Sequence, residues 1–242
     1  MKAYIRKNTD NNFANLNFTV ALDGFQKMGW EIISFHKVDE LSSLSKADIV
    51  VTYVDETKEI FSRLNVAYEN IDCYPTEISS YLGRKIWKES FFSFVKANRY
   101  GYFIKPSQEN KLFTGKVINR FGDLISIGQP EKDFEIYCSE PVKFVSESRC
   151  FVRYGSILDI RKYKGNWKAH LDIDLIEDCV SRYEGSPSGY AIDFGLTQSN
   201  ETILVEVNEG YSLGAYGLFS LDYAKLLSAR WFEIVGLDDP CD

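Results

Sequence analysis

The sequence predicts an α+β fold, and three observations support this prediction. Over the first 75 residues, segments with the two-residue period of strands alternate with segments of helical period. From residue 102 to residue 165, short strand-like segments follow one another. The last third combines a two-stranded hairpin with a closing amphipathic helix, 220–236. This order indicates a small N-terminal α/β lobe followed by two α+β lobes.

The N-terminal lobe is predicted from short apolar strands that alternate with amphipathic helices. Its expected strands cover 2–7, 30–35 and 47–53. Its expected helices cover 13–29 and 55–65. Gly29 stops the first helix, and Asp55 is in position to cap the second. The turn sequence YPTE then ends the lobe near residue 75, so the expected domains are 1–75 and 76–242.

The second domain is expected to hold a central lobe over about 98–140 and a C-terminal lobe over about 141–242. An apolar stripe through 79–101 favours a mostly helical segment at its start. The expected strands cover 102–107, 111–118, 134–140, 142–155 and 157–165. Further helices are expected over 119–129 and 172–185.

The composition limits the classes of function. Hydrophobic residues make up 45% and aromatic residues 15%, which indicates a globular chain with a large core. The net charge of -7 argues against general binding to nucleic acid or to anionic membranes. The start lacks the apolar run of a signal peptide and no later stretch is long enough to span a bilayer, so we expect a cytoplasmic protein. Five scattered cysteines and two histidines argue against structural zinc, and oligomeric state stays open.

Two acids interrupt the apolar strands of the predicted hairpin. With Ser199 and Asn200 at the tip, Asp193 faces Glu206 across the ladder. Facing carboxylates repel by roughly 4 kcal/mol at about 4 Å and an effective dielectric of about 20. A shared proton, a nearby basic residue or a divalent cation would offset this. Only the cation also accounts for a third oxygen donor at Asn208, although a solvated outer sheet face is the alternative.

Several motifs, taken in order, resemble the ATP-grasp superfamily over most of the chain. FIKPSQENKLFTGKV resembles the central-lobe strand and the phosphate-covering loop, so Lys105 and Lys116 would contact the phosphates of ATP. LGRKIWKESF resembles the helix that supplies another phosphate-binding cation, here Arg84. Lys105 taken alone would more often be a surface lysine at a strand end, and a helix-face cation without a ligand is the alternative for Arg84.

The segment IYCSEPVKFVSESRCFV resembles the hinge that receives adenine in this superfamily. The residues that would pass the base are Glu140, Pro141, Val142 and Lys143. Glu147 lies seven residues after Glu140 and would bond the ribose hydroxyls, because a carboxylate accepts two hydrogen bonds. Two glutamates in exposed strand positions would be unremarkable by themselves.

The hairpin resembles the metal-binding strands of the superfamily. There, an acid on one strand precedes a Glu and an Asn two residues apart on the next, and AIDF and LVEVNEG reproduce this pattern. The resemblance implies that Asp193, Glu206 and Asn208 hold Mg²⁺ or Mn²⁺ on ATP.

One family feature is missing. The peptide-ligase branches often carry an arginine two residues before the first metal acid, where it stabilises the acyl phosphate, and this chain has Ala191 there. Arg161 and Lys162, or Arg149 and Arg153, on neighbouring predicted strands would then supply the positive charge.

The resemblance implies an ATP-grasp fold whose lobes clasp ATP between them. The activity implied is an ATP-dependent carboxylate–amine ligase that forms an acyl phosphate and releases ADP and phosphate. Its substrates would be small-molecule or peptide carboxylates and amines. Two alternatives stay open: a kinase that uses the same nucleotide site, and a regulatory ATP-binding module without acceptor chemistry, which the alanine at position 191 favours.

Overall fold

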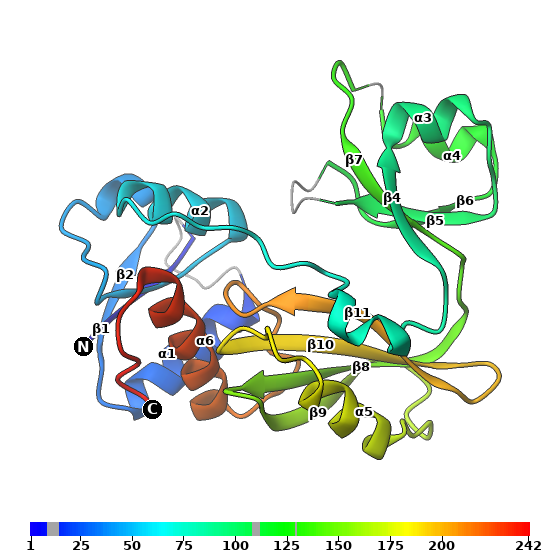
Figure 1. Cartoon of the computed structure of the whole chain (residues 1–242). Helices are drawn as coiled ribbons and strands as arrows, with labels where there is room; N and C mark the ends of the chain where they lie inside the picture. Colours follow the sequence, from blue (N-terminus) through cyan, green and yellow to red (C-terminus); the bar gives the residue numbers. More distant parts are fainter. Residues whose placement is uncertain (9–14, 108–111, 129) are drawn as a thin grey trace. The chain divides into compact units, whose positions relative to one another are not determined.

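The computed structural model describes residues 1–8, 15–107, 112–128 and 130–242. The chain forms two compact units (Figure 1). The larger unit consists of Met1–Tyr81 together with Val145–Asp242, and the smaller unit is Leu82–Phe144. The α+β class expected from the sequence is confirmed, since both units combine helices with sheets. The first 75 residues share the larger unit with the C-terminal sheet.

The N-terminal part of the larger unit contains a parallel three-stranded sheet with the order β2-β1-β3. Its strands are β1 (Lys2–Arg6), β2 (Glu31–Phe35) and β3 (Ile49–Val51). Its helices are α1 (Leu16–Lys27), the short 3-10 helix η1 (Val38–Glu40) and α2 (Val54–Arg63). The strands agree with the sequence prediction. The predicted cap of α2 was wrong, because the helix begins at Val54 and therefore contains Asp55 in its first turn.

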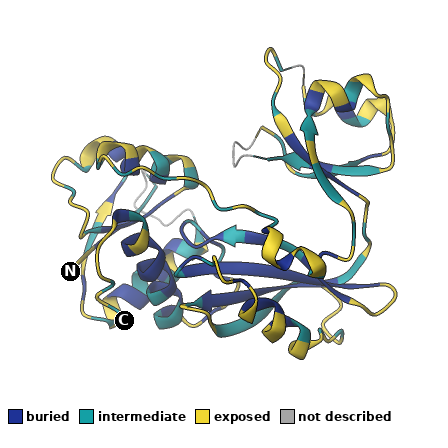
Figure 2. Ribbon diagram, viewed as in Figure 1, coloured by how far each residue is buried: buried dark blue, intermediate teal, exposed yellow. Residues whose placement is uncertain are grey.

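The C-terminal part of the larger unit contains an antiparallel four-stranded sheet with the order β11-β10-β8-β9. Its strands are β8 (Phe144–Arg153), β9 (Ser156–Gly165), β10 (Gly189–Thr197) and β11 (Thr202–Glu209). Its helices are α5 (Ile173–Ser181) and α6 (Ser220–Val235). Figure 2 shows that β8 and β10 are buried along most of their length, so this sheet forms much of the core.

Helices α1 and α6 connect the two sheets of the larger unit. Helix α6 packs against α1 and β10, and α1 packs in turn against β1 and β2. The two helices approach closely at Gly24, where a Cβ atom would lie 2.0 Å from the carbonyl oxygen of Ser220. Only glycine permits this approach, and the resulting core includes side chains from both sheets, such as Ile5 and Phe151.

The smaller unit contains an antiparallel sheet with the order β4-β7-β5-β6. Its strands are β4 (Ile86–Ser90), β5 (Tyr102–Pro106), β6 (Lys116–Ile118) and β7 (Glu135–Ser139). Its helices are α3 (Phe91–Lys96) and α4 (Phe121–Ile125). Both helices contribute to a core with Ile104 and Ile136, so they cover one face of this sheet.

The prediction of a mostly helical segment over 79–101 was wrong. The 3-10 helix η2 (Thr76–Tyr81) overlaps its first residues, and the segment then forms strand β4 and the short helix α3. β4 pairs along its whole length with β7, so partners distant in sequence outweigh the local helical pattern. Among the described residues, no helix is long and apolar enough to cross a bilayer.

Candidate functional site

Strands β10 and β11 pair in the register expected from the sequence. Asp193 faces Glu206, and Ala191 faces Asn208. Facing residues in an antiparallel ladder point to the same side of the sheet. The proposed metal ligands therefore share one face of the sheet.

Two irregularities compensate to give this register. The turn is longer than a two-residue tip at Ser199 and Asn200, since Thr197 N donates to Glu201 O at 2.9 Å. A bulge between Asp193 and Phe194 then leaves Val205 as the extra residue on β11. Alternation alone did not predict either feature.

Asp193 is not on a solvated outer face. Its exposure is 2%, and every residue of β10 is buried. Ala191, two residues earlier on the same face, is fully buried among the apolar residues that pack with α6. An arginine at position 191 would have to displace this core, which explains why the family arginine has no room there.

Arg149 on β8 supplies a guanidinium to Asp193 from the neighbouring strand. Its Nε and Nη2 atoms donate to the two carboxylate oxygens, each at 2.8 Å, and both side chains are buried. Burial raises the pKa of Asp193 and Glu206 adds to this effect, whereas Arg149 opposes it. The sequence-predicted positive charge near Asp193 is therefore present at Arg149.

Two tyrosines that the sequence analysis did not single out complete this cluster. Tyr163 and Tyr216 stack with ring centroids 4.8 Å apart, and the Arg149 guanidinium lies 4.9 Å from the Tyr216 centroid. The Tyr163 hydroxyl donates to Glu147 Oε2 at 3.1 Å and also lies 3.4 Å from Asp193 Oδ2, but its single hydrogen serves one acceptor at a time. Burial and these acids raise the pKa of Tyr163, so the hydroxyl stays a neutral donor.

A bulge on β9 explains why sequence periodicity missed Tyr163. Glu147 pairs with Lys164 and Ser148 pairs with Lys162, which leaves Tyr163 as the extra residue. The shift brings Lys164 to the same face as Glu147, and the Lys164 ammonium donates to the Glu147 carboxylate. Glu147, the predicted ribose ligand, is thus buried and engaged by two donors.

The two candidate cations on β9 lie on opposite sides of that strand. Arg161 is directly opposite Arg149 in the ladder and pairs with Asp159 Oδ2 at 2.5 Å. Lys162 lies on the other face and donates to the backbone oxygens of Asn166 at 3.0 Å and of Trp167 at 3.1 Å. The structure brings Arg149 and Arg161 to one face and holds Lys162 in a loop contact away from it.

The donor set at the hairpin fits a hard divalent cation. Asp193 Oδ1 accepts one bond from Arg149 and keeps a second lone pair, whereas Oδ2 accepts from Arg149 and also lies 3.4 Å from the Tyr163 hydroxyl. Asn208 Nδ2 is buried and has no hydrogen-bond partner among the described residues. The described ranges contain no group of three His, Cys, Asp or Glu suited to a metal, so a cation here depends on the Asn208 amide oxygen.

In the smaller unit, cationic side chains line the sheet face opposite the helices. Lys105 on β5 and Lys88 on β4 both face Tyr137 on β7. Their ammonium groups lie 5.7 Å and 4.9 Å from the Tyr137 ring centroid. Lys88 and Tyr137 were not singled out from the sequence, because β4 had been taken for a helix.

Lys116 does not join this cationic face. It pairs with Ile104, which points into the core beneath α3 and α4, whereas Lys105 points the other way. Its Nζ atom donates to Ser126 Oγ at 2.5 Å and to Asp123 O at 3.2 Å. Part of the expected phosphate-covering loop, 108–111, lies outside the described residues.

The remaining predicted nucleotide residues lie in irregular segments. Arg84 precedes β4 and donates to Leu82 O at 2.9 Å, so it is not on a helix as the resemblance implied. Glu140 follows β7 and accepts from Lys85 N at 3.1 Å. Pro141, Val142 and Lys143 continue from it without regular structure to β8.

Comparison with protein families identifies this fold. The model of the ATP-grasp domain, R2K clade family 2, matches residues 81–226, which is more than half of the chain. The chain belongs to this family, and the ATP-grasp fold expected from the sequence is confirmed. A comparison with curated protein sequences gives no match.

Solved structures support the same fold. D-alanine–D-alanine ligase from Bacillus anthracis has a TM-score of 0.58 at 11% identity, over 97% of this chain and 98% of that chain. N5-carboxyaminoimidazole synthetase from Staphylococcus aureus has a TM-score of 0.60 at 12% identity, over 99% of this chain and 78% of that one. L-amino acid ligase from Bacillus licheniformis has a TM-score of 0.58 at 10% identity, over 95% and 75%. At these identities the likeness establishes the fold alone.

Proposed function

We propose that this protein is an ATP-dependent carboxylate–amine ligase that acts through an acyl phosphate. The observation that carries the proposal is the facing pair of the buried Asp193 and the half-buried Glu206, with Asn208 on the same face and Arg149 bonded to Asp193. The carboxylate of one substrate would attack the γ-phosphorus of ATP, and ADP would leave. An amine would then attack the acyl carbon, lose a proton and release phosphate.

Cationic and carboxylate side chains would hold the nucleotide. In the smaller unit, Lys88 and Lys105 would neutralise phosphate charge, and Arg84 would add a further cation. Residues 140–143 would pass the adenine. In the larger unit, Glu147 would accept from the ribose hydroxyls after exchanging its contact with Lys164.

The hairpin would hold the metal of the nucleotide. Asp193, Glu206 and Asn208 would bind Mg²⁺ or Mn²⁺ through oxygen atoms. When bound, the cation would neutralise the phosphates and orient the γ-phosphate for in-line attack.

Arg149 is the best candidate for the residue that stabilises the acyl phosphate. Its guanidinium is held by Asp193 and by the Tyr216 ring, so its orientation is fixed before any substrate binds. Arg161 lies opposite on the next strand, where its side chain is 42% exposed and can add a second charge. The backbone contacts of Lys162 favour a structural role for that residue.

The names of structurally similar proteins favour ligation as the reaction class. They include the D-alanine–D-alanine ligase and the L-amino acid ligase, and also a D-cycloserine synthetase with a TM-score of 0.57 at 9% identity. A macrocyclase bound with its precursor peptide, with a TM-score of 0.51 at 12% identity, extends the range to peptide substrates. These names support joining a carboxylate to an amine as the reaction to test.

Replacement of one metal ligand tests the proposal. Glu206→Gln keeps the shape of the side chain but removes its charge, and we expect it to abolish ADP formation with Mg²⁺ or Mn²⁺ while the thermal unfolding temperature stays near that of the wild type. Glu201→Gln is the matched control, because Glu201 lies in the turn of the same hairpin and bonds Ser199. ATP consumption in Glu206→Gln equal to that of the control would exclude the metal assignment.

A further inference from the structure

A second polar cluster lies at the carboxyl end of the N-terminal parallel sheet. In the order β2-β1-β3, the chain passes from β1 to one side and then to the other, so the strand order reverses between β1 and β3. In open α/β sheets, ligands bind outside the carboxyl ends of the strands at such a point. Arg6 is the last residue of β1, and Thr52 directly follows β3.

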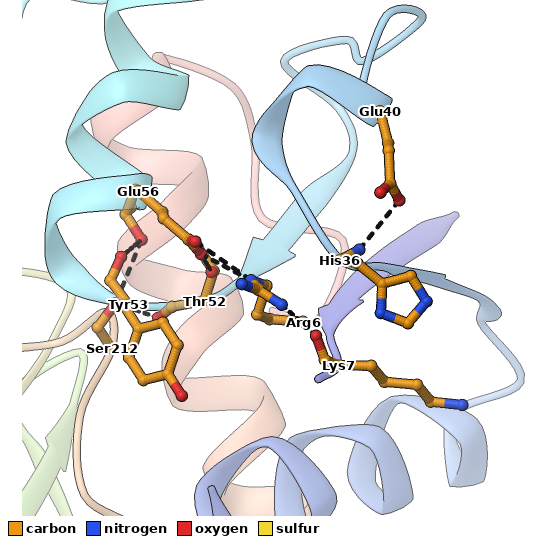
Figure 3. A network of polar contacts seen from close by, with 9 residues as sticks. Arg6, Lys7, His36, Glu40, Thr52, Tyr53, Glu56 and Ser212 are labelled. Atoms are coloured by element: carbon orange, nitrogen blue, oxygen red, sulfur yellow. Dashed lines mark hydrogen bonds and ion pairs between the residues drawn. The ribbon is translucent and has the colours of Figure 1, made fainter. Parts of the chain in front are cut away.

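Arg6 is held in this position by the first turn of α2 (Figure 3). Its Nε atom lies 3.2 Å and 3.1 Å from the two carboxylate oxygens of Glu56, and Thr52 also donates to Glu56. Its Nη1 atom donates to the backbone oxygen of Lys7. The Arg6 and Glu56 side chains are 18% and 24% exposed, so solvent still reaches the pair.

The guanidinium keeps donors for a ligand. Arginine has five N–H groups, and among the described residues the contacts of Arg6 use its Nε and Nη1 atoms. Its Nη2 amino group and the second N–H of Nη1 therefore have no partner there, and the Glu56 carboxylate fixes the plane of the guanidinium in advance. The edge formed by Nη1 and Nη2 suits a carboxylate, which it can bind through two parallel hydrogen bonds.

One loop connects this polar cluster to the proposed catalytic face. Ser212 lies four residues after Asn208, and its Oγ atom donates to Thr52 O at 2.6 Å (Figure 3). Two residues further along, a Cβ atom on Gly214 would lie 3.4 Å from Arg149 Nη1. The loop that leaves β11 thus contacts the end of β3 on one side and Arg149 on the other.

We propose that Arg6 binds the carboxylate of the amine substrate, which would then be an amino acid or a peptide with a free carboxyl end. Glu56 and Thr52 are positioning residues that orient the Arg6 fork. Ser212 connects this polar cluster to the loop that follows β11, the strand that bears Asn208. The role of this ligand as the amine substrate rests on the proposed ligase function. Its binding does not, because binding needs no ATP turnover.

Saturation-transfer NMR on the full chain, with and without Mg²⁺ and ADP, tests this inference. The probes are a pool of L-amino acids, a pool of dipeptides and a pool of amino-acid amides that lack the carboxylate. The variants are Arg6→Gln and Arg6→Lys, which keeps the charge but loses the fork. The matched control is Arg63→Gln, because Arg63 also pairs with acids of the N-terminal part, Glu59 and Asp39, and does not belong to the polar cluster around Arg6.

We expect signals from the acid or the dipeptide pool with the wild type and with Arg63→Gln, and none from the amides. The pool that responds distinguishes a free amino acid from a peptide. Arg6→Gln should abolish the signals, and Arg6→Lys should weaken binding by about tenfold or more, as expected for the loss of a bidentate ion pair. Equal signals in Arg6→Lys and the wild type, binding of the amides, or no binding to the wild type would each overturn the inference. Failure of the proposed ligase function in the Glu206→Gln test would not change these results, because the NMR experiment measures binding and needs no ATP turnover.

Discussion

Arg149 and Asp193 form a two-bond ion pair between the neighbouring strands β8 and β10, with both N–O distances at 2.8 Å. The pair is buried and is held on one side by the stacked rings of Tyr163 and Tyr216. Position 191 holds a fully buried alanine, so Arg149 is the cation that the structure places next to Asp193. The same face thus carries a proposed metal ligand and the cation closest to it.

Arg149→Gln should abolish ligation and lower the free energy of unfolding by about 3 kcal/mol, because it leaves a buried carboxylate without its partner. Arg153→Gln is the matched control: Arg153, also on β8, pairs with the buried Asp239 at 2.9 Å, outside the proposed site. We expect the control to lose similar stability in urea unfolding but to keep turnover in an ADP assay. Equal turnover in the two variants would contradict a catalytic role for Arg149.

Lys105→Ala and Lys88→Ala should each weaken the binding of Mg-ATP by about tenfold, as expected for the loss of one charged phosphate contact. Lys116→Ala should change it little, since Lys116 donates to Ser126 on the helix-covered face. Isothermal titration calorimetry with a non-hydrolysable ATP analogue measures all three. A larger loss of affinity in Lys116→Ala than in Lys105→Ala would support the sequence-based assignment of Lys116 as a phosphate contact.

Gly24→Ala should destabilise the larger unit by about 2 kcal/mol, because the new methyl group overlaps the Ser220 carbonyl oxygen at the crossing of α1 and α6. Gly122→Ala on α4 is the control, since a Cβ there has its nearest neighbour at 3.9 Å. Urea unfolding should show a loss for the first variant and no loss for the second. Equal stability of the two would mean that the helices can separate without cost.

Cys150 and Cys179 should resist alkylation in the native protein. Burial raises the pKa of each thiol to about 12, and the thiolate is the reactive form. Labelling at about pH 8 should therefore favour the half-buried Cys73, and the rate at Cys150 should rise about tenfold per pH unit above that. Mass spectrometry of the labelled peptides measures both rates, and rapid labelling of Cys150 at about pH 8 would show that β8 opens readily.

The sequence was sufficient to predict the hairpin register at Asp193 and Glu206, because side chains in a ladder alternate strictly and two irregularities cancelled. It was insufficient for β4, since the apolar spacing in IWKESFFSF suits a helix as well as a strand and the partner β7 lies about fifty residues later. Tyr163 escaped notice because a bulge, which no local pattern announces, changes its place on β9. Side chains that meet through such pairings, like Lys88 and Tyr137, become neighbours only in the folded chain.

The most direct test of the central claim follows oxygen from substrate to phosphate. The protein is incubated with Mg²⁺, ATP, a pool of amines and a pool of carboxylates labelled with ¹⁸O, and phosphorus NMR follows the products. An acyl phosphate requires that one carboxylate oxygen leaves with the phosphate, so we predict ADP together with inorganic phosphate that carries ¹⁸O. ADP with a stable phosphorylated product, unlabelled phosphate, or no turnover with any pool would contradict the ligase mechanism.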